Sequence, residues 1–190
     1  IKDVGTTNKT RSSDYQNAVC DKTGLILYAH TSNYRVVGFT EKIKIKELSK
    51  IARKNKVPIV VDAGSGCVGL FQEFGMPAEK TVKAYFKEGA DIVMFSGDKL
   101  LGGPQCGIIC GKKKYIDLIK KNSLYRALRS DKITFAILES TLRAYLLDNK
   151  FDNRNLAVNL LIRDRKKLMV LGKKIISKIP SSVIKESGIE

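Results

Sequence analysis

Residues 95–105 read FSGDKLLGGPQ and join two short apolar runs, at 90–95 and 106–110. Turn residues bound each run, which is typical of strands that are buried on both faces of a sheet. The connection contains three glycines and a proline, so its backbone can adopt positive φ angles and approach another group closely. The stretch therefore predicts a tight turn between two buried strands, with Lys99 in the turn.

Lys99 is the residue of this turn with the most reactive side chain. A lone lysine at a strand end is usually a solvated surface charge. Here Ser96 lies three residues earlier and can offer its hydroxyl to a phosphate group, while the Lys99 amine can form an imine with an aldehyde. A serine and a lysine in this arrangement are typical of a pyridoxal-phosphate site. Both interpretations stay open on this stretch alone.

The composition is that of an ordinary globular protein. With 190 residues and 43% apolar content, the chain can bury a core and needs to form only one domain. No apolar run reaches membrane-spanning length, and the first residues lack the basic start and apolar stretch of a signal peptide. Because the sequence does not begin with methionine, we expect the true N-terminus to lie upstream.

The cysteines do not indicate a metal site. They lack the paired C-x-x-C spacing of zinc ligands, and the chain contains a single histidine, so a zinc site is not expected. We interpret them as reduced and mostly buried thiols of a cytoplasmic protein: Cys20, Cys67, Cys106 and Cys110.

The formal net charge of +16 at pH 7 is large enough to attract a polyanion at low salt. Nucleic acid or another phosphate-rich partner is one interpretation. The other is the base composition of the source genome, because lysine outnumbers arginine and accompanies isoleucine and asparagine. The charge alone does not decide between them.

Strand and helix patterns alternate along the first 110 residues. We expect strands at 25–29, 57–62 and 90–95, a return strand at 106–110, and helices at 41–55 and 78–88. This order predicts an α/β fold with a mostly parallel, doubly wound sheet and right-handed crossovers. Ligands bind beyond the carboxyl ends of strands in such sheets, so Asn33, Asp62 and Lys99 are expected to meet in one pocket.

Polar side chains follow two of these strands. His30 begins the cluster HTSNYR at residues 30–35, although a structural histidine is the alternative for this residue alone. Asp62 follows three branched apolar residues, where a carboxylate is costly to bury without a partner. A protonated ring nitrogen of a cofactor would be such a partner. An aspartate that caps the following turn is the alternative.

The C-terminal half is helical and basic. Arg126 and Arg129 are three apart, so on a helical turn they would share one side and could grip an oxyanion together, or be a pair of surface charges. A helical region is expected over 154–179, and the chain after it could begin a second domain. We therefore predict a large domain over 1–150 and the start of a smaller one over 151–190.

Five blocks together resemble the bacterial selenocysteine synthases, the L-seryl-tRNA(Sec) selenium transferases. They are VGTTN at 4–8, HTSNYR at 30–35, DAGSG at 62–66, the lysine stretch at 95–105 and RALRSDK at 126–132. The resemblance runs from residue 3 to about residue 146. It implies the large domain of an aspartate-aminotransferase-like, pyridoxal-phosphate-dependent transferase.

The resemblance also implies how the cofactor is held. Lys99 would bind it as a Schiff base, Asp62 would hold the proton of its pyridine nitrogen, and Asn33 would bond its phenolic oxygen. His30 would stack on or near the ring, and Ser96 would hold the phosphate.

For the reaction, the resemblance implies seryl-tRNA(Sec) as substrate and selenophosphate as selenium donor. The seryl group would lose its α-proton and hydroxyl, and the aminoacrylyl group so formed would accept selenium, with Lys99 as the base. The remaining site residues would surround the donor's oxyanion: Arg126 and Arg129, with the polar Thr6, Thr7 and Asp98. We assign Asp98 to orienting Lys99 or to proton transfer, because an ionised carboxylate repels phosphate.

Members of this family normally carry further regions before residue 1 and after residue 190. The upstream region holds part of the phosphate cup and a small tRNA-binding domain, so we expect this chain to be a fragment of the enzyme. The family forms rings of dimers, in which Arg126 and Arg129 could serve a neighbouring subunit's cofactor. No membrane partner is expected.

Two other functions stay open. A related pyridoxal-phosphate lyase would act on a small amino acid or amino sugar, and a basic RNA-binding relative would have no catalytic activity. The presence of Lys99 and Asp62 favours an enzyme over the non-catalytic RNA-binding relative.

Overall fold

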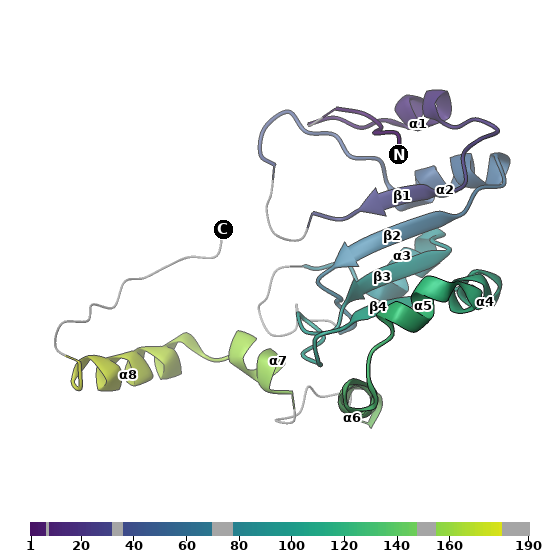
Figure 1. The fold of residues 1–190 in the computed structure, drawn as a ribbon. Helices are drawn as coiled ribbons and strands as arrows, with labels where there is room; N and C mark the ends of the chain where they lie inside the picture. The colour runs from purple at the N-terminus through teal and green to yellow at the C-terminus, as the bar shows by residue number, and fades with distance from the viewer. Residues whose placement is uncertain (7, 32–35, 70–77, 148–154, 180–190) are drawn as a thin grey trace.

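Four strands form the sheet at the centre of the computed structural model (Figure 1). The structure describes residues 1–6, 8–31, 36–69, 78–147 and 155–179. The strands follow one another across the sheet in chain order: β1 (Ile26–Ala29), β2 (Ile59–Gly64), β3 (Ile92–Ser96) and β4 (Gly107–Gly111). The first three are parallel, and β4 returns antiparallel to β3. The predicted mostly parallel α/β sheet is confirmed.

Two crossover helices join the parallel strands, α2 (Ile45–Lys54) and α3 (Val82–Glu88). Because the strands advance in one direction and such crossovers are right-handed, both helices lie on the same face of the sheet (Figure 1). Leu48 of α2, Tyr85 of α3 and Val93 of β3 are almost completely buried in the core between these helices and the sheet. Burying each such side chain contributes roughly 1.5–3 kcal/mol.

Three further helices follow β4, and they cover part of the opposite face (Figure 1). They are α4 (Lys113–Lys121), α5 (Ser123–Leu128) and α6 (Lys132–Leu147). Side chains alternate across a strand, so Met94 and Ile109 point toward these helices while their neighbours point into the core. The sheet therefore has helices on both faces.

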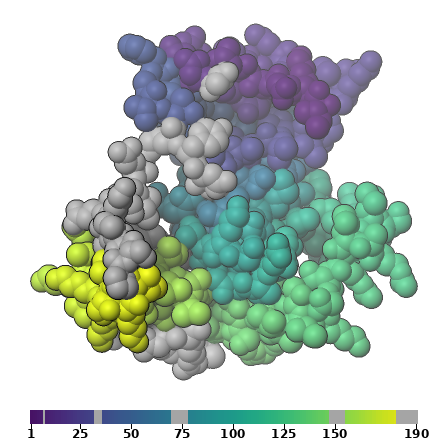
Figure 2. Space-filling view, turned by 60° about the vertical axis from the view of Figure 1, so that its left-hand side comes forward, coloured from purple at the N-terminus to yellow at the C-terminus, as the bar shows by residue number. Residues whose placement is uncertain are grey.

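The two ends of the chain add short helices. At the N-terminal end, α1 (Ser12–Ala18) packs on α2. Where one helical region was expected at the C-terminal end, there are two helices, α7 (Leu156–Leu161) and α8 (Arg165–Ile176). The break occurs because the Asp164 side chain accepts from the amides of Lys166 and Lys167 and so starts a new helix. Figure 2 shows these yellow-green helices below the teal centre of the molecule.

Within the described residues, no helix is long and apolar enough to cross a membrane. The same residues contain no group of three or more potential metal ligands that could hold an ion.

Candidate active site

The carboxyl ends of β1 and β2 bring His30 and Asp62 together. In the parallel register, Ala29 lies opposite Asp62, and the backbone amide of His30 donates to the carbonyl oxygen of Asp62 at 2.8 Å. On the other side Asp62 is opposite Met94 of β3. Asp62 thus has a neighbouring strand on each side. It lies near the carboxyl ends of the parallel strands, which is the edge of the sheet where ligands bind in this class of fold.

The Asp62 carboxylate has two different surroundings. Its Oδ1 atom accepts from the amide of Gly64 at 3.0 Å, which is the turn-capping role considered as an alternative. Among the described residues, Oδ2 makes no hydrogen bond, and the side chain lines a pocket on the α4–α6 face. Capping the turn therefore leaves one carboxylate oxygen for a ligand.

His30 belongs to a small network that sequence reasoning missed. Its Nε2 atom lies 3.3 Å from Oε1 of Glu79, and Ser65 donates its hydroxyl to the same oxygen at 2.9 Å. The edge of the imidazole meets the Tyr85 ring, with the ring centres 6.3 Å apart. Burial raises the pKa of the Tyr85 hydroxyl above its ordinary value. No pattern in the sequence distinguished Glu79 from the other surface carboxylates.

Lys99 lies in a tightly bonded connection between β3 and β4. The amide of Gly97 donates to Cys106 at 2.8 Å, that of Gly103 donates to Gly97 at 2.8 Å, and that of Gly102 donates to Lys99 at 2.9 Å. A Cβ atom on Gly97 would lie 2.6 Å from the Cys106 sulfur. The turn predicted from the glycines is therefore present, and Gly97 is needed for close contact between its two sides.

One hydrogen bond ties this connection to the turn after β2. The amide of Leu100 donates to the carbonyl oxygen of Ser65 at 3.0 Å, which places Lys99 beside the segment that carries Asp62. The Lys99 side chain is exposed, and within the described part of the chain its amine has no hydrogen bond or ion pair. Asp98 is exposed too; burial and the Asp98 carboxylate raise the pKa of the neighbouring Cys106 thiol.

The two arginines are placed differently from each other. Helix α5 ends at Leu128, and Arg129 has an extended backbone with φ −66° and ψ 140°. The expectation that Arg126 and Arg129 share a helical turn is therefore wrong. The extended backbone at Arg129 ends α5. Two residues later, the Asp131 side chain accepts from the amides of Ile133 and Thr134 and so caps the start of α6.

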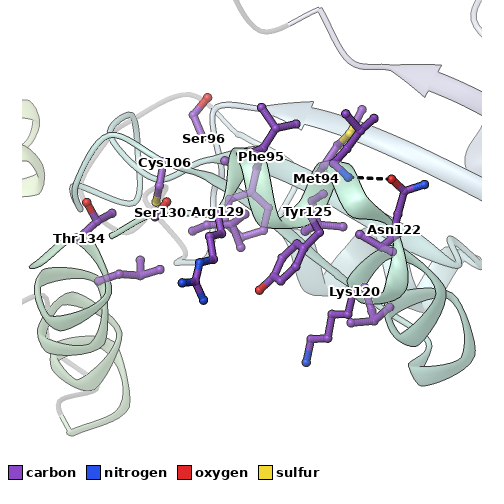
Figure 3. Close-up of a pocket in the computed structure, with 18 of the residues that line it drawn as sticks. Met94, Phe95, Ser96, Cys106, Lys120, Asn122, Tyr125, Arg129, Ser130 and Thr134 are labelled. Atoms are coloured by element: carbon purple, nitrogen blue, oxygen red, sulfur yellow. Dashed lines mark hydrogen bonds between the residues drawn. The ribbon is translucent and has the colours of Figure 1, made fainter. Parts of the chain in front are cut away.

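Arg129 lines a pocket of about 950 Å³ together with Ser96 and Asp62, whereas Arg126 does not. Figure 3 shows Arg129 at the end of α5, near Ser130 and Cys106, with Ser96 above them. The Ser96 hydroxyl and the Arg129 guanidinium point away from each other in this view. Most of the pocket wall is apolar, and it is formed by α4, α5 and α6 together with β3 and β4.

The remaining predicted site residues are less informative. Thr6 donates its hydroxyl to the Lys9 carbonyl oxygen at 2.9 Å within its own turn, and among the described residues no hydrogen bond joins it to another site residue. Thr7 and Asn33 lie outside the described residues. The structure therefore brings His30, Asp62, Ser96 and Lys99 to one edge of the sheet, with Arg129 on the adjoining pocket. Their roles stay predictions.

Comparison with known proteins gives the family. The sequence model described as L-seryl-tRNA selenium transferase matches residues 1–189. The chain belongs to the L-seryl-tRNA selenium transferase family. This confirms the resemblance that the five sequence blocks indicated.

Three relatives show the extent of the match. L-seryl-tRNA(Sec) selenium transferase of Caldanaerobacter subterraneus subsp. tengcongensis is 58% identical over 145 residues, covering 76% of this chain and 32% of the relative. The protein of that name from Alkaliphilus oremlandii is 54% identical over 146 residues, covering 77% of this chain and 31% of the relative. The Clostridium botulinum protein is 45% identical over 165 residues, with 87% and 36% covered. The chain thus spans about a third of the length of the selenium transferases it matches.

A solved structure supports the fold. D-glucosaminate-6-phosphate ammonia-lyase superposes with a TM-score of 0.61 at 22% identity, covering 78% of this chain and 37% of that chain. At this identity the similarity shows the fold alone.

Proposed function

We propose that this chain is part of a pyridoxal-phosphate-dependent transferase that converts seryl-tRNA(Sec) to selenocysteyl-tRNA(Sec) with selenophosphate as donor. Membership of the L-seryl-tRNA selenium transferase family supports the reaction. The structural observation that carries the proposal is the exposed Lys99, held beside the Asp62 turn by the bond between Leu100 and Ser65.

The residues at the sheet edge fit the proposed cofactor by their chemistry. Pyridoxal phosphate presents an aldehyde, a pyridine nitrogen, a flat ring and a phosphate group. The edge offers an amine in Lys99, a carboxylate oxygen in Asp62, an imidazole in His30 and a hydroxyl in Ser96. When bound, the cofactor supplies an electron sink for the negative charge that develops at the seryl α-carbon.

Each residue has a specific task in this proposal. Lys99 would hold the cofactor through its amine and, when that amine is free, would take the α-proton of the seryl group. Asp62 keeps the pyridine nitrogen protonated, because an adjacent carboxylate favours the positive charge. His30 lies against the ring, and Ser96 donates to the phosphate. Asn33 bonds the phenolic oxygen.

The donor side of the reaction is assigned to the arginines. The α-proton and hydroxyl of the seryl group would leave as water, the selenium of selenophosphate would add to the resulting aminoacrylyl group, and a water molecule would cleave the selenium–phosphorus bond to release phosphate. Arg126 and Arg129 bind the donor's oxyanion, Thr6 and Thr7 line the same pocket, and Asp98 orients Lys99 or moves a proton. Because Arg126 is absent from the pocket that Arg129 lines, we propose that Arg126 acts at the site of a neighbouring subunit in a homo-oligomer.

The rest of the chain fits a macromolecular substrate. The net charge of +16 favours a polyanion such as tRNA, and charged tRNA places the reaction in the cytoplasm. We further propose that residues 1–150 belong to the catalytic domain and that a smaller domain begins within 151–190.

The test uses the intact protein. Pyridoxal phosphate is added, borohydride reduction fixes any imine, and peptide mapping locates the modified lysine. We expect modification at Lys99, none in Lys99→Ala, and no change in the control Lys114→Ala, an exposed lysine of α4.

Selenium transfer from labelled selenophosphate to seryl-tRNA(Sec) is then measured. Transfer that requires Lys99 is the expected result. Modification of Lys99 without transfer, but with release of ammonia from a small amino acid or amino sugar, would instead indicate the lyase. A protein that takes up no cofactor but binds RNA would be the non-catalytic relative.

A further inference from the structure

Two side chains from the C-terminal part of the chain hold one carbonyl group of the lysine turn. The Leu101 carbonyl oxygen accepts from the Tyr145 hydroxyl at 2.9 Å and from the Asn155 side-chain amide at 2.9 Å. Tyr145 lies on α6, and Asn155 is the residue before α7. The two donors are themselves 3.3 Å apart, so they close on the carbonyl as a pair, which we call the Leu101 clamp.

Both polar atoms of the Asn155 side-chain amide are hydrogen-bonded. Its side-chain oxygen accepts from the Val158 amide at 3.1 Å and so caps α7, while its nitrogen donates to Leu101. The residue is only 9% exposed, and a buried amide is costly unless it is hydrogen-bonded. Val158 is fully buried against Cys67, which anchors the start of α7 under the turn after β2.

Gly102 makes the close approach possible. A Cβ atom at this position would lie 2.2 Å from the side-chain oxygen of Asn155, and its φ of +69° disfavours other residues. The Gly102 amide donates to the Lys99 carbonyl oxygen at 2.9 Å. The clamped Leu101 is therefore inside the turn that begins at Lys99.

The bond from Leu100 to Ser65 fixes the same turn from the opposite side. Leu100 and Leu101 are thus held by the turn after β2 and by the clamp, while Lys99 itself is exposed. Figure 2 shows the yellow-green α7 region beside the teal strand region from which the lysine turn extends. The backbone next to Lys99 is therefore hydrogen-bonded from two sides, while the Lys99 side chain is accessible.

We propose that Tyr145 and Asn155 are positioning residues for Lys99: by holding the Leu101 peptide, they fix the turn that presents the lysine amine to the cofactor. This inference rests on the proposed function, because it takes Lys99 as the residue that binds pyridoxal phosphate. It also connects the region after residue 150, expected to begin another domain, to the reactive lysine.

The substitution Asn155→Asp separates the clamp from the helix cap. Aspartate caps a helix as well as asparagine does, so the bond from Val158 is retained. The donor to Leu101 is lost, and a carboxylate oxygen then faces a carbonyl oxygen. Tyr145→Phe removes the second donor and leaves the aromatic ring in place. The matched control is Asp164→Ala, which removes the cap of the next helix, α8, and does not touch the lysine turn.

The first measurement is hydrogen–deuterium exchange of residues 97–103 in the intact, cofactor-free protein. Loss of one buried hydrogen bond predicts exchange that is about five- to tenfold faster at the amides of Gly102 and Gly103. We expect this in Asn155→Asp and in Tyr145→Phe, and wild-type exchange in Asp164→Ala. Should Asn155→Asp fail to fold, Tyr145→Phe decides the question alone.

The second measurement is the rate constant for covalent capture of pyridoxal phosphate at Lys99, trapped with borohydride. We expect a decrease of about fivefold in both clamp variants and none in the control. If wild type captures the cofactor and both clamp variants match it in exchange and capture, the positioning role is overturned and the proposed function stands. If wild type captures no cofactor at Lys99, the proposed function is overturned and the inference falls with it.

Discussion

The imidazole Nε2 of His30 lies 3.3 Å from a carboxylate oxygen of Glu79. The hydroxyl of Ser65 donates to that same oxygen at 2.9 Å. Glu79 therefore joins the polar residue after β1 to the turn after β2, and the Leu100 amide continues the connection from Ser65 to the lysine turn. Glu79 thus links two segments of the candidate site directly, and Ser65 links them to the third, the lysine turn.

Removing this acceptor is expected to weaken cofactor binding. In Glu79→Ala, His30 and Ser65 lose the partner that fixes them, so we predict that the Kd for pyridoxal phosphate rises by about three- to tenfold. Glu79→Gln keeps an acceptor oxygen and should lie closer to wild type. Fluorescence titration of the intact protein measures both, and equal affinity in all three proteins would remove Glu79 from the site.

Asp62 is expected to affect the reaction more than cofactor capture. Asp62→Asn retains the oxygen that accepts from Gly64 but removes the negative charge that we propose to lie beside the pyridine nitrogen. We predict that the rate of selenium transfer falls roughly a hundredfold or more, while borohydride still traps the cofactor at Lys99. The control is Asp117→Asn on the surface of α4. Wild-type transfer by Asp62→Asn would refute the assignment.

The sheet was predictable from sequence because its strands are short apolar runs with turns on both sides. Residues 59–61 and 92–93 are buried. A short run of apolar residues is the sequence pattern expected of a strand that is buried on both faces, so the pattern was sufficient to predict these strands. The break between α7 and α8 was missed, although Asp164 is a recognisable capping residue. The charged residues at 163–167 are equally typical of the solvated face of one continuous helix, and this hides the break.

The site was predictable only where its residues lie next to a strand end. Asp62, His30 and Lys99 follow apolar runs, so parallel strands bring them to one edge. Glu79 and Asn155 lie in irregular segments, and their partners are far away in sequence; Asn155 and Leu101 are 54 residues apart. Local patterns carry no information on contacts of that range. Arg129 was misplaced because α5 ends one residue before it.

The cysteines provide a test of packing. Cys67 is 2% exposed, and burial raises the pKa of its thiol to about 11. Cys20 is exposed. The thiolate is the reactive form of cysteine. At neutral pH the raised pKa alone lowers the thiolate fraction of Cys67 roughly a hundredfold relative to a cysteine with an ordinary pKa.

Alkylation with iodoacetamide at pH 7.5, located by peptide mass, should therefore label Cys20 first. Labelling of Cys67 should accelerate as the pH rises toward 11. Val158→Ala loosens the contact over Cys67 and should expose the thiol at unchanged pH. Equal rates for Cys20 and Cys67 in the native protein would contradict this packing.

Asp91 is expected to be important for the stability of the sheet. Its carboxylate accepts from the amide of Ile59, a fully buried residue, at 2.9 Å, and it pairs with Lys112 after β4. Asp91→Ala leaves that amide without an acceptor, so we predict a loss of about 1–3 kcal/mol in the free energy of unfolding. Urea denaturation of the intact protein measures it.

The control for Asp91 is Asp117→Ala, which breaks an exposed i,i+4 pair with Lys113. Such surface pairs contribute about 0.2–1 kcal/mol. A loss in Asp91→Ala no greater than that of the control would show that the bond to Ile59 does not stabilise the sheet.

The antiparallel pairing of β3 with β4 determines when the lysine turn can form during synthesis. The contacts within the lysine turn, such as that between Gly97 and Cys106, join residues that leave the ribosome almost together. Asn155 lies 54 residues beyond Leu101, and at typical elongation rates it is made roughly 3–11 s later. The nascent chain therefore shapes the turn around Lys99 first and acquires the Asn155 contact that secures it only seconds afterwards.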